Sequence, residues 1–179
     1  GTPFAELEDF KSNVKQLSEL GVKFIDLTGG EPLLHKDIHL MAEYAKSYKM
    51  QTSITSNALL YPKFADKLAG KINLLHFSLD SPDEEEHNKI RGVFESLKIA
   101  KSLGEYPDVL FTVTNDTYKK LPRMHEIAKQ NDLVLLVNPV FSYFGNPGLT
   151  DEAIDFIEKY IDGKMDIYLN KAFLKLRRN

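Results

Sequence analysis

Apolar residues recur along the chain with two different spacings. Leu7, Phe10, Val14 and Leu17 follow one another every three or four positions, as on one face of an amphipathic helix. Between segments of this kind lie short apolar runs such as residues 22–28, which are typical of buried strands. The pattern predicts helices over residues 5–20, 36–48, 62–68, 83–103, 118–129 and 151–162, and strands over residues 22–28, 50–55, 72–79, 109–114 and 133–137, with an additional edge strand over residues 165–169.

The regular alternation of strands and helices indicates an α/β fold. Because the connections are short, parallel strands joined by crossover helices are predicted. Gly92 is expected to interrupt the helix over residues 83–103, Thr150 to cap the helix that follows it, and a short basic helix to begin near Lys171. The chain contains no linker and no low-complexity segment, so we predict a single domain over residues 2–179.

Composition narrows the possible functions. The net charge of −3 argues against a broad basic surface for nucleic acid. A membrane-spanning helix is not expected, because the chain has no apolar run of about 18 residues, and its first residues do not have the pattern of a signal peptide. The chain has no cysteine, which excludes disulfides, a thiolate nucleophile and a cysteine-ligated cluster within these residues.

Small polar and acidic residues follow the apolar body of five predicted strands. Any one of these ends is explained by the preference of Asn, Asp, Ser and Gly for turns and caps. Five such ends together favour a shared polar site, because ligands of parallel βα folds gather where strands end. Such a site suits a ligand with hydroxyl, ammonium and carboxylate groups. The strand ends are Thr28-Gly29-Gly30-Glu31, Thr55-Ser56-Asn57, Ser78-Leu79-Asp80-Ser81, Thr114-Asn115-Asp116 and Asn138-Pro139.

The third predicted strand alternates between polar and apolar residues. His76, Ser78 and Asp80 share one face, because side chains alternate along a strand, and the residues between them are apolar. This alternation predicts one face on helices and the other towards a polar lumen. His76 is open to two interpretations, either a ligand or base, or a lumen residue whose hydrogen bonds are satisfied.

The adjacent Gly29 and Gly30 allow a ligand to approach the backbone closely, and Glu31 adds a carboxylate that suits an ammonium group. Neither of the usual glycine-rich phosphate-binding patterns is present. Three segments follow one another along the chain: residues 24–34 (FIDLTGGEPLL), residues 56–60 (SNALL), and Ser78-Leu79-Asp80-Ser81 with His87 and Ile90-Arg91-Gly92. In this order they resemble the GGEP segment, the T-N-G-x-L-L segment and the S-L-D…H…R-G stretch of radical S-adenosylmethionine (SAM) enzymes. The resemblance is to the molybdenum-cofactor and peptide-modifying branches in particular.

The resemblance implies a role for each matching position. It places Gly29, Gly30 and Glu31 at the amino group of SAM. The other implied contacts are Ser78 and Asp80, with Asn57 as a weaker candidate, near the ribose hydroxyls, Arg91 at the methionine carboxylate, and Asn115 with Val137–Asn138 near adenine or substrate. No catalytic residue and no metal ligand is implied within this chain.

The resemblance also implies a partial parallel (β/α)6 TIM-like barrel, here lacking its first strand and comprising strands two to six plus a C-terminal helix. In the intact parent, an oxidoreductase, lyase or transferase of the cytoplasm, a [4Fe-4S] cluster and an electron donor cleave SAM to a 5′-deoxyadenosyl radical that attacks a small-molecule or peptide substrate. Two departures stand out: Ala58 replaces the usual glycine, and the C-x-x-x-C-x-x-C motif is absent. We therefore expect a fragment that is inactive by itself.

Several alternatives remain open at the level of sequence. Arg91 could instead form salt bridges with the acidic residues 83–86. His35 and His39 are four positions apart and could share a helix face as metal ligands, or simply face solvent. For the whole chain, the alternatives are a cluster-free binding or scaffold module and a barrel lyase of unrelated mechanism.

Overall fold

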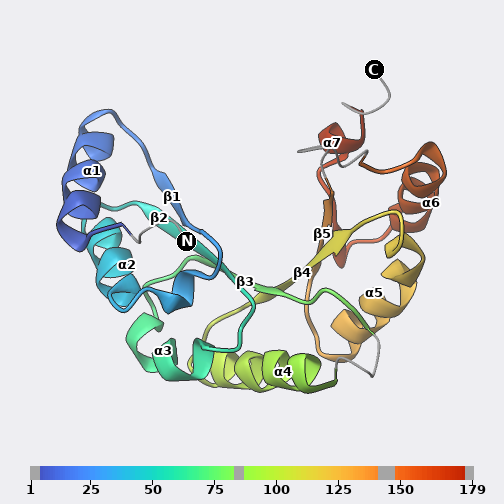
Figure 1. The fold of residues 1–179 in the computed structure, drawn as a ribbon, viewed down its shortest axis with the longest axis horizontal. Coiled ribbons are helices and arrows are strands. Elements are labelled where there is room, and N and C mark those ends of the chain that lie inside the picture. The colour runs from blue at the N-terminus through green and yellow to red at the C-terminus, as the bar shows by residue number, and fades with distance from the viewer. Residues whose placement is uncertain (1–4, 83–86, 141–147, 176–179) are drawn as a thin grey trace. The chain divides into compact units, whose positions relative to one another are not determined.

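The computed structural model describes residues 5–82, 87–140 and 148–175, without the side chains of residues 87–91 and 175. Helices and strands alternate along it, as Figure 1 shows. The helices are α1 (Leu7–Glu19), α2 (Ile38–Ser47), α3 (Tyr61–Leu68), α4 (His87–Ser102), α5 (Leu121–Gln130), α6 (Asp151–Ile161) and α7 (Lys171–Lys175), with the short 3-10 helices η1 (Pro32–Leu34) and η3 (Tyr118–Lys120). The strands are β1 (Phe24–Leu27), β2 (Gln51–Ser56), β3 (Leu74–Ser78), β4 (Asp108–Val113), β5 (Leu135–Pro139) and β6 (Ile167–Tyr168).

The strands form a six-stranded sheet in the order β1-β2-β3-β4-β5-β6. The pairings of β1 with β2, β2 with β3, β4 with β5 and β5 with β6 are all parallel. The register places Asp26 opposite Ser53 and Ile54 opposite Leu75. The predicted α/β fold with parallel strands and crossover helices is therefore confirmed, including the short edge strand near residue 167.

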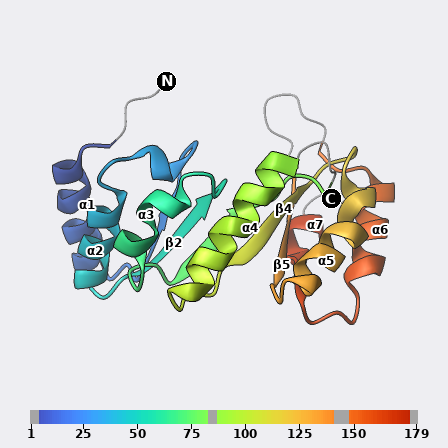
Figure 2. The same ribbon diagram turned by 90° about the horizontal axis from the view of Figure 1, so that it is seen from below.

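The chain divides into two compact units, of which the first comprises residues 1–77 and 91–107. In this unit α1 and α2 lie beside β1 and β2, as Figures 1 and 2 show. Val14 of α1 is buried with Ala45 and Met50, and Phe10 and Leu17 pack against this cluster. The predicted apolar face of the first helix therefore packs into the core.

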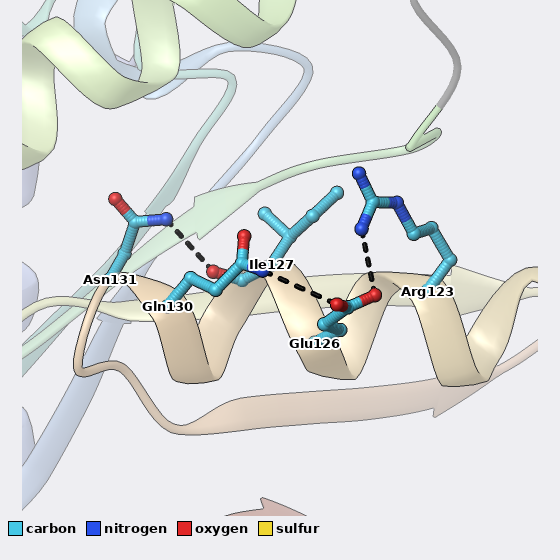
Figure 3. Close-up of polar contacts among 5 residues, drawn as sticks. All are labelled: Arg123, Glu126, Ile127, Gln130 and Asn131. Carbon is cyan, nitrogen blue, oxygen red and sulfur yellow. Dashed lines mark hydrogen bonds and ion pairs between the residues drawn. The ribbon is translucent and has the colours of Figure 1, made fainter.

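The second unit comprises residues 78–90 and 108–179. Phe111, Leu135 and Ile157 are fully buried in it and come from β4, β5 and α6. The outer face of α5 is polar: Arg123 donates to Glu126 at 2.7 Å and Gln130 to the same carboxylate at 3.3 Å, as Figure 3 shows. Asn131 donates to the carbonyl of Ile127 at 2.8 Å and so completes the last turn. The prediction of a single domain over residues 2–179 stays a prediction.

Four helices end in the same way. The residue after the helix cap has a positive φ, and the next amide donates to the carbonyl five positions earlier, as in the Schellman motif. Glycine occupies this position at Gly21 and Gly104, with φ of 83° and 80°. Lys49 and Asp132 adopt the same left-handed conformation, with φ of 57° and 55°, although they carry side chains. The motif therefore depends on the fold and does not require glycine.

The expected break at Gly92 is wrong, because α4 continues from His87 to Ser102. An added Cβ at Gly92 would lie 3.0 Å from Cδ2 of Leu59, so glycine leaves room for the turn after β2. Glycine weakens a helix by about 1 kcal/mol relative to alanine but does not by itself end it. Thr150 caps α6 as predicted, accepting from the amide of Ala153 at 3.3 Å. Among the described residues, no helix is long and apolar enough to cross a membrane.

Candidate functional site

Gly29 and Gly30 lie just after β1, separated from it by Thr28, and are both exposed. Gly29 has a φ of 158°, which side-chain-bearing residues rarely adopt. No atom lies within 4 Å of the place where a Cβ would stand on either glycine. We refer to residues 28–32 as the glycine-pair segment. At both glycines the backbone is exposed, and a group placed at the Cβ position would meet no other protein atom.

The carboxylate of Glu31 joins the glycine-pair segment to the end of β2. Its Oε1 accepts from the amide of Leu33 at 3.0 Å and from the hydroxyl of Ser56 at 2.8 Å. Its Oε2 accepts from the amide of Asn57 at 2.8 Å. These three hydrogen bonds come from η1, from β2 and from the turn after β2, so the carboxylate fixes the ends of two neighbouring strands relative to each other.

The turn after β2 has hydrogen bonds of its own. Oγ of Ser56 accepts from the amide of Ala58, and Oδ1 of Asn57 from the amide of Leu59, both at 3.0 Å. Ala58 has a φ of 67°, so it adopts the conformation for which glycine is usual. Its carbonyl accepts from the hydroxyl of Ser96 of α4 at 2.8 Å. The substitution of glycine by Ala58 therefore leaves the left-handed turn in place.

A cavity of about 580 Å³ lies against the glycine-pair segment. Its apolar wall includes Phe10 of α1 and Ile38 and Met41 of α2, and its polar edge includes Asp26 and Glu31. The side chains of both helices therefore reach the same region as the backbone of the glycine pair.

The two histidines near this segment do not form a metal site. His35 precedes α2, where its Nε2 donates to the carbonyl of Ala5 at 2.9 Å while its Nδ1 accepts from the amide of Asp37 at 3.0 Å. His39 lies within α2, and burial, assisted by two nearby lysines, lowers its pKa. No group of three or more potential ligands among His, Cys, Asp and Glu occurs in the described part of the chain. Both histidines are half-buried, so each is partly exposed to solvent.

Two of the predicted ribose contacts, Ser78 and Asp80, belong to the second unit, whereas the weaker candidate Asn57 belongs to the first. Ser78 ends β3 and is half-buried, and Asp80 follows and is exposed. His76 lies in the same strand and is also half-buried. The expected alternation of polar and apolar residues along the strand is confirmed, because the residues that alternate with these three are buried. These are Leu75, Phe77 and Leu79.

Asn115 follows β4, and both the nitrogen and the oxygen of its side-chain amide are hydrogen-bonded within the protein. Nδ2 donates to the carbonyl of Gly148 at 2.7 Å, and Oδ1 accepts from the amide of Thr150 at 2.8 Å. Asn138 lies in β5 opposite Thr112 and is half-buried. The side chain of Asn115 therefore joins two segments of the protein, and the expectation that both asparagines lie near adenine or substrate stays a prediction.

The remaining predicted residues lie on α4 or just before it. Arg91 and His87 belong to this helix, but their side chains lie outside the described part, and so do the acidic residues 83–86. Sequence reasoning gave no role to Ser56. The available signal was the position of Ser56 at the end of a strand and before a turn. There a serine hydroxyl can accept from the backbone amide two residues later and form an ST turn.

Comparison with known proteins identifies the family to which this sequence is similar. The profile of the radical SAM superfamily matches residues 2–160. A probable GTP 3′,8-cyclase of Methanococcus maripaludis is 33% identical over 177 residues, which cover 92% of this chain and 58% of the relative. Another, from Methanopyrus kandleri, is 27% identical over 158 residues, covering 82% of this chain and 52% of the relative. This chain thus spans little more than half the length of these relatives.

Solved structures share the fold. Streptococcus suis SuiB bound to S-adenosylmethionine has a TM-score of 0.72 at 16% identity, covering 94% of this chain and 44% of SuiB. Native anSMEcpe with bound AdoMet and Cp18Cys peptide has a TM-score of 0.72 at 19% identity, covering 99% of this chain and 55% of that protein. The α/β fold with a partial parallel barrel is therefore confirmed. Because the family profile matches most of this chain, residues 2–160, the chain belongs to the radical SAM superfamily.

Proposed function

We propose that this chain is the SAM-binding part of a radical SAM enzyme whose intact form cleaves SAM reductively. The observation that carries the proposal is the glycine-pair segment, with its exposed backbone and its fixed carboxylate. An ammonium group needs acceptors on several sides, and peptide carbonyls beside a carboxylate provide them. SAM presents such an ammonium group at its methionine end.

The proposal assigns a part of SAM to each candidate residue. The peptide groups of Gly29 and Gly30 bind the amino group, and Glu31 orients them while its negative charge adds attraction. Arg91 pairs with the methionine carboxylate, as a planar guanidinium does well. Ser78 and Asp80 take the ribose hydroxyls, Asn57 is a weaker contact, and Asn138 takes adenine or substrate, with Asn115 shaping the loop beside it.

The iron–sulfur cluster of the family does not fit the residues of this chain. Its ligands are cysteine thiolates, and the chain has none. We therefore assign this chain no step of the radical chemistry, and its part is to bind and orient SAM. The chain by itself is proposed to be inactive.

For the parent, we propose GTP as the substrate and an electron donor as the partner, in the cytoplasm. Support comes from the relatives named probable GTP 3′,8-cyclase, which are 27% to 33% identical over most of this chain. A peptide substrate is the competing class. Assay of the full-length protein with GTP and with peptides, under anaerobic and reducing conditions, separates the two.

Calorimetric titration of the chain with SAM tests the binding proposal. The matched variant is Gly30→Ala, because an added methyl meets no atom of the protein and Gly30 does not have a positive φ. We expect Gly30→Ala to fold as the wild type does and to weaken SAM binding about tenfold, since the methyl obstructs the backbone. Equal affinity of the two proteins contradicts the assignment of the glycine pair.

Anaerobic incubation of the chain with iron and sulfide tests the inactivity. We expect no stoichiometric cluster and no formation of 5′-deoxyadenosine from SAM. Turnover by the chain alone contradicts the proposal, because it requires cluster ligands that are not cysteine.

A further inference from the structure

We propose that Ser56 is a positioning residue, whose hydroxyl holds Glu31 and thereby presents the peptide groups of Gly29 and Gly30 to the ligand. The inference rests on the proposed function. It assigns to a buried serine, through its hydrogen bond to Glu31, control over the geometry of the neighbouring glycine backbone.

The hydrogen bonds of Ser56 leave its hydroxyl a single orientation. The side chain is 2% exposed, so water does not compete for it. A hydroxyl has one proton and two acceptor positions, and the amide of Ala58 donates to Oγ at 3.0 Å. The proton is therefore free for Oε1 of Glu31, which lies 2.8 Å away.

The three donors to Glu31 are not equivalent. Those from Leu33 and Asn57 are backbone amides, whereas Ser56 supplies a side-chain hydroxyl that a mutation can remove. Without it, Oε1 keeps the amide of Leu33, and Oε2 keeps the amide of Asn57 in the turn after β2, but the described bond from β2 itself is lost. A hydrogen bond to a charged group is stronger than one between neutral groups, so its loss is expected to bias the conformation of an exposed loop.

The same hydrogen bonds continue to α4. Ser96 of that helix is fully buried and donates to the carbonyl of Ala58, whose amide donates to Ser56. Arg91, proposed for the methionine carboxylate, lies on α4 as well. Ser56 therefore connects the segment proposed for the amino group of SAM to the helix proposed for its carboxylate, within one compact unit.

Ser53 provides a matched control. It lies on β2 as Ser56 does, is 3% exposed, and donates to Oδ1 of Asp26 at 2.5 Å. Asp26 lies opposite it within β1, before the glycine-pair segment begins. Removing either hydroxyl thus breaks a partly buried hydrogen bond from a serine of β2 to a carboxylate, but only Ser56 donates to Glu31.

The experiment compares wild type, Ser56→Ala, Ser56→Thr and Ser53→Ala. Amide hydrogen exchange in the ligand-free chain is measured at Gly30, Leu33 and Asn57, and SAM affinity is measured by calorimetry. We expect Ser56→Ala to speed exchange at these amides and to weaken SAM binding, each about tenfold. Ser56→Thr keeps the hydroxyl and is expected to restore both. Ser53→Ala is expected to lower the stability of the fold about as much as Ser56→Ala does. It is expected to leave the exchange rates and the SAM affinity within about twofold of wild type.

Two outcomes overturn the inference: Ser56→Ala leaves exchange and affinity within twofold of wild type, or Ser53→Ala changes them equally. A third outcome concerns the proposed function alone. If the wild-type chain does not bind SAM, the proposed function fails, and the exchange at Gly30, Leu33 and Asn57 still decides whether Ser56 holds the segment.

Discussion

The backbone amide of Thr150 donates a hydrogen bond to Oδ1 of Asn115 at 2.8 Å. Through the Nδ2 bond to Gly148, the same side chain joins the loop after β4 to the residues that begin α6. A carboxamide offers a donor and an acceptor in the geometry of a peptide group. The side chain of Asn115 therefore pairs with the backbone at Gly148 and Thr150 much as another stretch of backbone would.

Replacing Asn115 tests this structural role. We expect Asn115→Ala to lower the free energy of unfolding by about 1 to 2 kcal/mol, since the partly buried carbonyl of Gly148 and the more exposed amide of Thr150 both lose this partner. Asn115→Asp is expected to cost at least as much, because an oxygen then faces the carbonyl of Gly148. Urea unfolding measures both, with Asp116→Ala at the exposed neighbouring position as control. An effect no larger than that of the control contradicts the role.

Lys49 is expected to be a site where glycine is more stable. Its φ of 57° lies in the left-handed region, which costs a residue with a Cβ about 1 kcal/mol or more. The greater freedom of glycine in the unfolded chain offsets part of this gain. We therefore expect Lys49→Gly to raise the free energy of unfolding by about 0.5 kcal/mol, measured by urea denaturation.

The reverse change at Gly21 is the matched test. This residue ends α1 with a φ of 83°, and an added Cβ would meet no atom within 4 Å. Gly21→Ala is therefore expected to lower stability by about 1 kcal/mol through backbone conformation alone. The same sign of change at both positions contradicts the explanation.

Tyr61 carries a buried hydroxyl without a hydrogen-bond partner among the described residues. Burial, followed by the nearby carboxylates of Glu105 and Asp66, raises the pKa of Tyr61 to about 12. We expect Tyr61→Phe to leave stability at pH 7 unchanged or to raise it by up to about 1 kcal/mol, because an unpaired hydroxyl is costly to bury. Tyr106→Phe, at a position 90% exposed, is the control and is expected to have no effect.

The pH dependence gives a second measurement on the same variant. The folded protein holds the Tyr61 proton more tightly than the unfolded chain, whose tyrosine pKa is about 10. Its contribution to stability is therefore complete below pH 10 and is lost as the pH rises from about 10 to 12. Unfolding of Tyr61→Phe is expected to depend less on pH in this window. Identical profiles for both proteins contradict the raised pKa.

The carboxylate of Glu152 is expected to depend on the hydroxyl of Tyr118. This hydroxyl donates to Oε1 at 2.7 Å and, with Lys119 as the second contributor, lowers the pKa of Glu152. Tyr118→Phe is expected to raise that pKa towards its ordinary value, as measured by NMR titration of the side-chain carboxyl. Lys119→Met is the comparison and is expected to raise it less.

The sign of the resulting stability effect follows from the lowered pKa. Glu152 contributes stability above the pKa of a glutamate in the unfolded chain, about 4.3, and loses it as the pH falls through the lower folded value. We therefore expect Tyr118→Phe to unfold with a weaker pH dependence in acid than the wild type. An unchanged acid profile contradicts the hydrogen bond as its cause.

Much of the fold could be predicted from the sequence because its causes are local. Apolar spacing within one turn or one strand sets which face is buried, so the elements matched to within a few residues. The cap at Thr150 and the helix ends at Gly21 and Gly104 follow from the same local rules. The break expected at Gly92 was wrong because a neighbouring side chain, Leu59, and not the local sequence, accounts for that glycine.

The sequence by itself determined the order of elements, the family resemblance and the glycine pair. Only the tertiary structure decided what Glu31 and Asn115 do with their side chains. Their partners Ser56 and Thr150 lie 25 and 35 positions away, and which groups meet depends on the register of parallel strands. A shift of one residue between β1 and β2 would turn Ser56 to the opposite face of the sheet, so no local pattern encodes that contact.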